Sequence, residues 1–435
     1  MKYFSLNHNA QSVSFDKAVV QGLAPDRGLY FPETIPSLPA SFFDRIEKLS
    51  DHEIAFTAMR PFVSKEVLSD GALKKIVEDT LQFPFPLVPI TNEIASLELF
   101  QGPTLAFKDV GARFMARCLA NFHKTSNDKK VTVLVATSGD TGGAVADGFF
   151  AVPGIEVVIL YPKGKVSEIQ EKQLTTLGRN ISALEVEGTF DDCQDMVKSA
   201  FIDPQIKDKI QLTSANSINV ARWLPQMFYY FFAYKALKEK GVKLAIAVPS
   251  GNFGNLCAGL MAQKMGLPID HFVACTNIND TVPVFLEDGI YTPKPSQQTL
   301  SNAMDVGDPS NFIRIQKIFN NDFLKLKKGL KGYRFTDTDT KKAIQDVFAS
   351  SGYICDPHGA VGYLGLKAFL EEQPKDNYYG VFMETAHPIK FVDTVEKALK
   401  TKIPVPKQIE KVLRGEKKSF PITDYKDLKT FLLSH

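Results

Sequence analysis

Short β-branched runs alternate with helical runs through much of this chain, and that alternation limits the fold more than any other feature. From Val131 onward, four apolar runs each lead into a helical stretch, namely "VTVLVA", "EVVILYP", "ISALEVEG" and "KLAIAVPSG". A further strand, "GVFM", stands just before Thr385. Strands that alternate with helices usually pair in parallel, because each helix carries the chain back across the sheet. We therefore predict an α/β fold with parallel sheets covered by helices on both faces.

The first 85 or so residues lack this alternation. They contain scattered turn signals, as in "LAPDRGLYFPETIPSLP", and short helical runs. A chain of 435 residues is long enough for two or three domains. We predict a separate N-terminal domain, residues 1–88, that ends at the proline-rich "QFPFPLVP", and a larger domain, residues 89–435.

The composition narrows the class of partner. The 51 basic and 49 acidic side chains give a net charge of +2, so no strong field favours nucleic acid or an anionic membrane. We expect a small molecule. The five cysteines are far apart and form no CxxC pair, so neither a disulfide framework nor a metal site is predicted. Without an apolar leader or a long apolar run, we expect a cytoplasmic protein.

One lysine stands where a helix is expected to begin. In "GPTLAFKDVGARFMARCLANF", residues 102–122, the apolar side chains recur with helical spacing from Val110 to Phe122. The helix should begin between Phe107 and Asp109, where its partial positive charge disfavours a protonated Lys108. Such a lysine has more free amine, the nucleophile that forms an imine with a carbonyl cofactor. The alternative is a surface lysine at the end of a helix.

Two glycine-rich turns each follow a predicted strand and open a helix. The first is "TSGDTGGAVADGFF", which begins at Thr137. The second, "PSGNFGNLCAG", carries two asparagines among its glycines. Backbone N–H groups at such turns, together with the helix end, can bind an anion. Tight turns without a ligand remain the alternative for both.

Two further stretches carry polar residues without defining a chemistry alone. "SANSINVARWLPQ" contains Arg222, whose guanidinium can form a forked contact to a phosphate or carboxylate, although for this stretch alone an ordinary helix start is the favoured interpretation. In "METAHPIKF", Thr385 lies at the carboxyl end of a strand, where open α/β sheets bind ligands. His387 and Lys390 are nearby, but the histidines allow no hydrolase triad to be assembled.

Taken together, six motifs resemble the threonine synthase family, pyridoxal-phosphate enzymes of the tryptophan-synthase-β-like fold, or fold type II. In chain order they are "GPTLAFKDVGARF", "ATSGDTGGAVADGF", "SANSINVARWLPQ", "PSGNFGN", "SNAMDVGDPSNF" and "ETAHPIKF". The N-terminal "VSFDKAVVQGLAPDRGLYFP" is similar to the N-terminal domain of the microbial form, so the resemblance covers essentially the whole chain. It implies two parallel-sheet subdomains with the active site between them, the smaller including about residues 105–190, plus the small N-terminal domain.

The resemblance also implies a role for individual residues. Lys108 would bond covalently to pyridoxal 5'-phosphate and then act as the general base. The cofactor phosphate would be held by Gly251, Asn252, Phe253, Gly254 and Asn255, and the hydroxyl of Thr385 would face the pyridine nitrogen. The substrate is expected to be O-phospho-L-homoserine. Its carboxylate would be held by Ser138, Gly139, Asp140 and Thr141 or by their backbone N–H groups, and its phosphate by Asn216, Ser217 and Arg222. No role is implied for "SNAMDVGDPSNF".

The expected reaction is the conversion of O-phospho-L-homoserine and water to L-threonine and phosphate, the last step of threonine biosynthesis. The assembly would be a monomer or a homodimer. A fold type II lyase or dehydratase that releases 2-oxobutyrate would share nearly every motif. A non-catalytic binding protein on the same fold is a third reading, but that class would lack the lysine.

Overall fold

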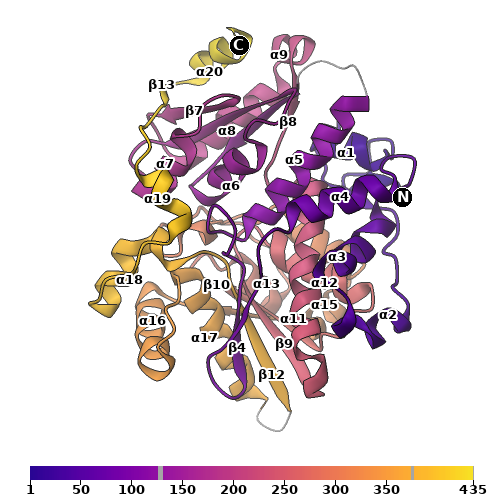
Figure 1. The fold of residues 1–435 in the computed structure, drawn as a ribbon, viewed down its shortest axis with the longest axis vertical. Helices are drawn as coiled ribbons and strands as arrows, with labels where there is room; N and C mark the ends of the chain where they lie inside the picture. The colour runs from indigo at the N-terminus through magenta and orange to yellow at the C-terminus, as the bar shows by residue number, and fades with distance from the viewer. Residues whose placement is uncertain (126–130, 374–376, 435) are drawn as a thin grey trace.

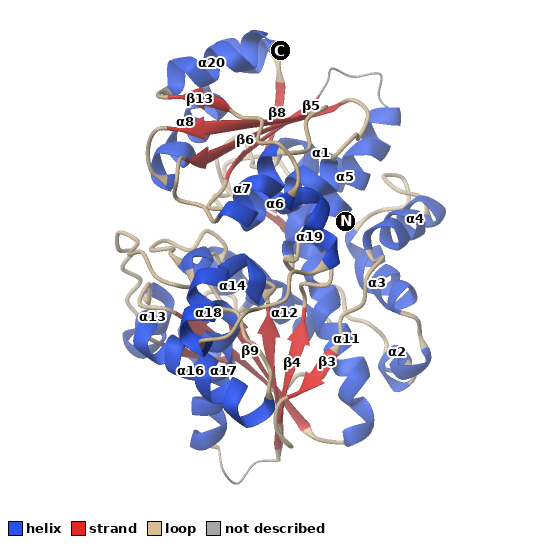
Figure 2. Ribbon diagram, turned by 60° about the vertical axis from the view of Figure 1, so that its left-hand side comes forward, coloured by secondary structure: helices blue, strands red, loops and turns tan. Residues whose placement is uncertain are grey.

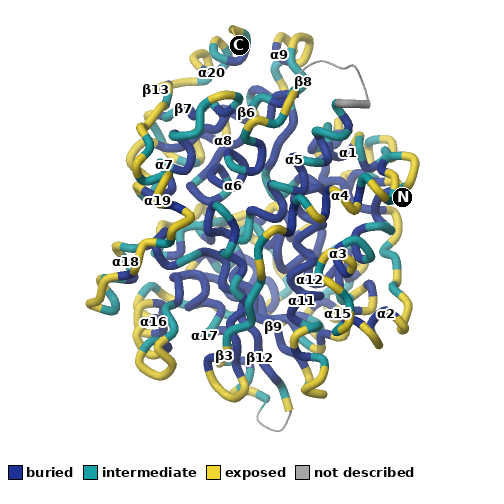
Figure 3. Tube along the Cα trace, viewed as in Figure 1, coloured by how far each residue is buried: buried dark blue, intermediate teal, exposed yellow. Residues whose placement is uncertain are grey.

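Two parallel sheets, stacked along the long axis of the molecule, organise the chain (Figures 1 and 2). The structure is a computed structural model that describes residues 1–125, 131–373 and 377–434. Buried segments run through the middle of the molecule, and exposed segments form its outer loops and peripheral helices (Figure 3). The parallel α/β architecture predicted from the alternating runs is confirmed.

The smaller sheet has the strand order β13-β7-β6-β5-β8, and all its pairs are parallel. Its strands are β5 (Val131–Ala136), β6 (Ile155–Pro162), β7 (Ile181–Val186), β8 (Gln211–Thr213) and β13 (Phe420–Ile422). Every residue of β5 is buried, because Val133 and Val135 face one hydrophobic core while Leu134 and Ala136 face another. Burial on both faces explains why "VTVLVA" is apolar throughout instead of alternating.

The larger sheet has the order β11-β10-β9-β12-β4-β3, in which only β3 runs antiparallel to its neighbour. Its strands are β3 (Leu87–Pro89), β4 (Ile94–Glu98), β9 (Lys243–Pro249), β10 (His271–Thr276), β11 (Leu330–Arg334) and β12 (Tyr378–Glu384). Strands β9 and β12 are adjacent in the middle of the sheet, so the residues that follow their carboxyl ends meet at one edge.

Helices connect and cover the two sheets. After the N-terminal region they are α5 (Lys108–Thr125), α6 (Asp140–Phe149), α7 (Glu168–Thr175), α8 (Phe190–Ile202), α9 (Pro204–Lys209), α10 (Val220–Trp223), α11 (Phe228–Leu237), α12 (Gly254–Lys264), α13 (Thr281–Asp288), α14 (Phe312–Ile318), α15 (Phe323–Gly329), α16 (Asp337–Ser351), α17 (Pro357–Glu372), α18 (Val392–Leu399), α19 (Lys407–Leu413) and α20 (Tyr425–Ser434). Short 3-10 turns are η3 (Leu224–Met227), η4 (Lys238–Lys240), η5 (Asn302–Met304) and η6 (Pro388–Phe391).

The N-terminal region packs beside both halves. It contains β1 (Tyr3–Ser5), α1 (Phe15–Gln21), β2 (Tyr30–Pro32), α2 (Ala40–Asp44), η1 (Ile46–Lys48), α3 (Asp51–Met59), η2 (Arg60–Phe62) and α4 (Asp70–Thr80). Helix α4 packs on α5, and α3 packs on α11. The ring of Phe43 stacks on that of Phe231, so this region shares its core with the rest of the chain. The division into 1–88 and 89–435 remains a prediction.

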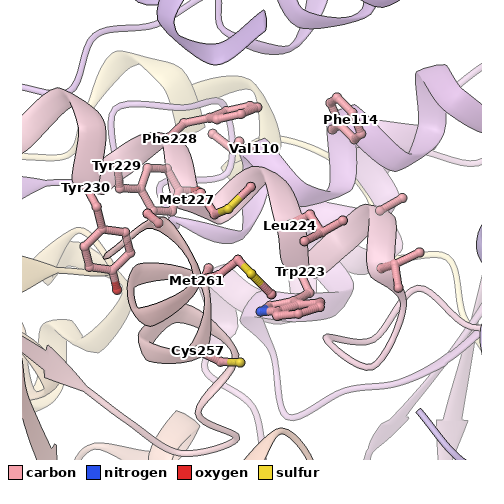
Figure 4. Close-up of a cluster of buried hydrophobic side chains, with 14 of the residues drawn as sticks. Val110, Phe114, Trp223, Leu224, Met227, Phe228, Tyr229, Tyr230, Cys257 and Met261 are labelled. Carbon is pink, nitrogen blue, oxygen red and sulfur yellow. The ribbon is translucent and has the colours of Figure 1, made fainter. Parts of the chain in front are cut away.

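A cluster of buried side chains joins the helices that lead into the two halves (Figure 4). Val110 and Phe114 of α5 face Trp223 and Met227, which precede α11, and Met261 of α12 lies on the same cluster. Helix α5 begins at Lys108, within the range predicted, and the apolar face of that helix is buried. The cluster therefore holds the first turns of α5 and α12 in one fixed frame.

All five cysteines are free and buried. Within the described residues, no cluster of three or more His, Cys, Asp or Glu side chains is arranged to hold a metal ion. Over the same residues, no helix is both long and apolar enough to cross a membrane.

Candidate active site

A cavity of about 810 Å³ lies where the two sheets face each other. It is lined by residues of the β5–α6 turn (residues 137–141), the β9–α12 turn (residues 250–255) and the start of α5. Of the predicted site residues, the lining includes Lys108, Ser138, Thr141, Asn216, Ser217, Arg222, Gly251, Asn252, Phe253, Gly254 and Asn255. Gly139, Asp140 and Thr385 are not part of the lining.

The segment that leads into Lys108 is held from several sides. The backbone N–H of Phe107 donates to the carbonyl of Thr385 at 2.9 Å, and the hydroxyl of Tyr229 donates to the carbonyl of Phe107. Asp109 accepts a hydrogen bond from the backbone N–H of Thr104 at 2.9 Å and another from its hydroxyl. The lysine therefore begins its helix from a backbone that has little freedom to move.

The amino group of Lys108 is largely buried and has several charged side chains near it. Its side chain is only 18% exposed, and its Nζ lies 3.9 Å from a carboxylate oxygen of Asp140. Burial lowers the pKa of Lys108, and the cations of Lys390 and Arg222 lower it further, while Asp140 opposes them. The direction is the one inferred from the sequence. The physical cause differs, since burial and two neighbouring cations act here in addition to any effect of the helix end.

The β9–α12 turn is shaped for close approach and keeps an open donor. Phe253 adopts a left-handed conformation with φ of 60° as it caps α12. A Cβ atom on Gly251 would lie 2.7 Å from the carbonyl oxygen of Ala303, so only glycine fits there. Asn255 accepts from the hydroxyl of Tyr230 at 3.0 Å, but its Nδ2 is buried with no partner. An unsatisfied buried donor beside a helix N-terminus fits the phosphate group of a cofactor.

The stretch "SNAMDVGDPSNF", to which the sequence assigned no role, forms the wall over this turn. Ala303 and Met304 pack against Gly251. The backbone N–H of Ala303 donates to Nε2 of His358 at 3.2 Å, and Asn311 donates to the hydroxyl of Ser217 at 3.0 Å. The stretch thus ties the β9–α12 turn to Ser217 of the cavity lining and to His358 of α17.

The β5–α6 turn satisfies much of its own hydrogen bonding. The hydroxyl of Thr137 accepts from the N–H of Gly139 at 2.9 Å and from that of Gly142 at 2.8 Å. The carboxylate of Asp140 accepts from Gln170 Nε2 at 2.9 Å and pairs with Lys390 Nζ at 2.7 Å. Burial would raise the pKa of Asp140, but the two lysines and Gln170 hold it well below its usual range. The side chain of Asp140 is therefore an anion in contact with cations.

Asn216, Ser217 and Arg222 form a third part of the lining. The guanidinium of Arg222 is 3% exposed and donates to the carbonyl of Ala215, yet its Nε has no partner. Burial lowers the pKa of Arg222 to about 10, so it remains charged at neutral pH. Asn216 Oδ1 is likewise buried and unpartnered. The Asn216 oxygen is an acceptor, so it is the open Nε–H donor of the charged Arg222 that lets this corner bind a second anion.

Thr385 lies beside the site but not on the cavity wall. It follows the carboxyl end of β12 and is 7% exposed. Its carbonyl holds Phe107, next to Lys108, as described above. The structure thus brings Thr385 next to the lysine through the backbone, and a role for its hydroxyl remains a prediction.

No role was predicted from the sequence for Lys390, a charged side chain that the structure buries. Lys390 is fully buried, pairs with Asp140 and donates to the carbonyl of Thr104 at 3.0 Å. The signal in the sequence was a lysine inside the apolar run "HPIKF", where a charge needs a buried partner. The partner itself lies 250 residues earlier in the chain, so spacing did not reveal it.

A lysine at a helix start that shares an inter-sheet cavity with two glycine-rich strand-to-helix turns defines a class, the pyridoxal-phosphate-dependent enzymes of fold type II. The family model for pyridoxal-phosphate-dependent enzymes matches residues 84–383. Models for the N terminus and the C-terminal part of threonine synthase match residues 2–81 and 359–432. The chain belongs to the threonine synthase family, and its cofactor is pyridoxal phosphate, as predicted.

Relatives and solved structures agree with this membership. The chain is 41% identical to threonine synthase from Escherichia coli and 44% identical to that from Buchnera aphidicola of Acyrthosiphon pisum, with 100% of each chain covered. The crystal structure of the Escherichia coli enzyme superposes with a TM-score of 0.92 over the full length of both chains. A pyridoxal-phosphate-bound threonine synthase from Brucella melitensis gives a TM-score of 0.91 at 33% identity, covering 100% of this chain and 99% of that one.

More distant structures share the fold alone. Maize serine racemase superposes with a TM-score of 0.55 at 14% identity and covers 80% of this chain.

Proposed function

We propose that this chain is a threonine synthase that acts on O-phospho-L-homoserine and water and releases L-threonine and phosphate. The observation that carries the proposal is one cavity that joins Lys108 to two corners with unsatisfied buried donors, at Asn255 and at Arg222. Two such corners suit two phosphate groups, one on the cofactor and one on the substrate. Full-length relatives named threonine synthase support the same assignment.

Pyridoxal phosphate, when bound, supplies an electron-withdrawing ring that makes the α-carbon of an amino acid acidic. In this proposal Lys108 bonds to the cofactor, and the β9–α12 turn, residues 251–255, holds its phosphate. The hydroxyl of Thr385, which follows β12 beside the cavity, would accompany the ring nitrogen of the bound cofactor. Once the substrate amine has replaced it, Lys108 takes the proton from the α-carbon as a general base.

The substrate is held at its two charged ends. Ser138 and Thr141 line the cavity and bind the α-carboxylate with their hydroxyls and backbone N–H groups. Arg222, Asn216 and Ser217 bind the phosphate that leaves. The side chain of Asp140, first grouped with the carboxylate site, is an anion already paired with Lys390, so we assign it no contact with the substrate carboxylate.

Product analysis tests the reaction. The purified enzyme with pyridoxal phosphate should convert O-phospho-L-homoserine to equal amounts of phosphate and L-threonine. If 2-oxobutyrate is the main product, the chain is instead a lyase or dehydratase that shares the fold.

Absorbance tests the role of Lys108. The protein mixed with pyridoxal phosphate should gain the visible band of a lysine-bound cofactor, and Lys108→Ala should abolish that band and lower kcat by about 100-fold or more. A matched control is Lys235→Met, which removes a lysine whose ion pair with Asp51 spans 2.8 Å outside the cavity. A colourless wild-type preparation would support the non-catalytic alternative.

Location and assembly complete the proposal. Free, buried thiols at all five cysteines support a reducing compartment such as the cytoplasm. We propose a monomer or a homodimer, which light scattering of the eluted protein distinguishes.

A further inference from the structure

A buried lysine outside the cavity lining has a direct electrostatic link to the site. Lys390 of η6 has no exposed surface, and its Nζ is bound by two oxygens, a carboxylate oxygen of Asp140 at 2.7 Å and the carbonyl oxygen of Thr104 at 3.0 Å. That carbonyl also accepts from Gln173 at 3.0 Å. A fully buried cation is costly unless it is paired, so this geometry fixes Lys390 in place.

The carboxylate of Asp140 is shared unequally between two lysines. Oxygen Oδ1 contacts Lys390 at 2.7 Å and Gln170 at 2.9 Å, both within hydrogen-bond distance. Oxygen Oδ2 lies 3.9 Å from Nζ of Lys108, which is too long for a hydrogen bond. Asp140 is thus bound by Lys390, and the negative charge of Asp140 acts on Lys108 without a hydrogen bond between them.

Four charged groups from different elements face Lys108. Asp140 comes from α6, Lys390 from η6, Arg222 from α10, and Asp356 from the N-terminal cap of α17. The two cations disfavour a proton on Lys108 and the two anions favour it. If Lys390 were removed, Asp140 would keep Lys108 as its nearby cationic partner, and the balance would change toward a charged Lys108.

We propose that Lys390 is a positioning residue that acts through Asp140: by binding its carboxylate, Lys390 prevents a close ion pair with Lys108 and leaves the amino group of Lys108 easier to deprotonate. The proposal rests on the assignment of Lys108 as the cofactor-binding lysine and base. It gives a function to a buried charge that lies outside the cavity lining.

The test measures the protonation of Lys108 directly. The full-length chain, freed of pyridoxal phosphate, is treated with an amine-acetylating reagent over a range of pH, and the labelled Lys108 peptide is quantified by mass spectrometry. Lys390→Met should move the labelling midpoint of Lys108 upward by about one pH unit or more, because an opposing cation is lost and Asp140 is released. Asp140→Asn should move it downward, since an anion is lost.

If Lys390 only stabilised the fold, the labelling midpoint of Lys108 would not move in opposite directions in Lys390→Met and Asp140→Asn. Because Lys390 acts through Asp140, the shift caused by Lys390→Met should be smaller in the Asp140→Asn background, where only the direct repulsion between Lys390 and Lys108 is lost. Lys390→Gln takes the place of Lys390→Met if the latter fails to fold. Lys235→Met, the remote lysine of an ion pair, should leave the midpoint unchanged. With pyridoxal phosphate bound, the acidic limb of the kcat profile should move to higher pH in Lys390→Met.

An unchanged or lowered midpoint upon loss of Lys390 in the otherwise wild-type chain, or an equal rise in the Asp140→Asn background, overturns the inference. Failure of the underlying assignment looks different. In that case Lys108→Ala would keep the visible cofactor band, whatever the midpoints of the other variants.

Discussion

The two strand-to-helix turns that open on the cavity have similar sequences but opposite hydrogen-bonding states. In the β5–α6 turn, the hydroxyl of Thr137 occupies the N–H groups of Gly139 and Gly142, and Asp140 is paired with Lys390. In the β9–α12 turn, a donor of Asn255 remains buried without a partner. A glycine-rich turn is therefore not by itself an anion site; what distinguishes a binding turn is the donors it leaves unsatisfied.

The same contrast extends to charge. The β5–α6 turn contains a carboxylate whose field reaches Lys108, whereas residues 250–255 of the β9–α12 turn include no acidic side chain. The second turn therefore suits a dianionic phosphate better than the first, where Asp140 already pairs with Lys390. We therefore interpret the β5–α6 turn as the one that tunes the lysine and orients the substrate, and the β9–α12 turn as the one that anchors the cofactor.

The largest effect should come from filling the space at Gly251. In Gly251→Val, the new Cβ would stand 2.7 Å from the carbonyl oxygen of Ala303 and 2.8 Å from Cα of Met304, and both are backbone atoms that cannot rotate away. We expect a cost of about 3 kcal/mol, or about 100-fold weaker binding of pyridoxal phosphate, measured by fluorescence titration. Gly71→Ala is the control, since nothing lies within 4 Å of its new Cβ. Equal affinities for wild type and Gly251→Val would contradict this account of the turn.

Two substitutions with smaller expected effects should show that one turn binds the cofactor and the other the substrate. Asn255→Ala removes the open donor and should weaken cofactor binding by about 10-fold, the loss of one hydrogen bond to a charged group. Ser138→Ala should instead raise KM for O-phospho-L-homoserine by about 10-fold and leave cofactor affinity unchanged. If both variants changed the same constant, the division of roles between the turns would be wrong.

Much of the architecture could be predicted because its signals are local. Strand β5 was predicted from the run "VTVLVA". Helix α5 was predicted from the helical spacing between Val110 and Phe122, and it begins at Lys108 as expected. Strands β8 and β13 were not predicted, since each has three residues and no measurable periodicity. Their pairing with β5 and β7 is decided by tertiary contacts from distant parts of the chain.

The residues that line the site could largely be predicted, but the contacts between their side chains could not. The motifs named most of the residues that line the cavity, because glycines and polar groups at strand ends have few structural reasons to be there. The contacts of the Asp140 side chain with Gln170 and Lys390 were not predicted, because both partners come from other helices. Such pairings depend on how elements pack, and no spacing in a single sequence encodes them.

The smallest effect we predict concerns the internal bonding of the β5–α6 turn. Thr137→Val keeps the shape of the side chain but removes the oxygen that accepts from Gly139 and Gly142. Two N–H groups then lose their acceptor, and because this turn lines the cavity, water can take over part of the bonding. We expect a loss of about 1 kcal/mol in the free energy of unfolding, measured by urea denaturation. Thr137→Ser keeps the hydroxyl and should retain most of the stability. If Thr137→Val unfolded with the same free energy as the wild type, the hydroxyl of Thr137 would not stabilise this turn. The N–H groups of Gly139 and Gly142 would then be open to a ligand, as the side-chain donor of Asn255 is.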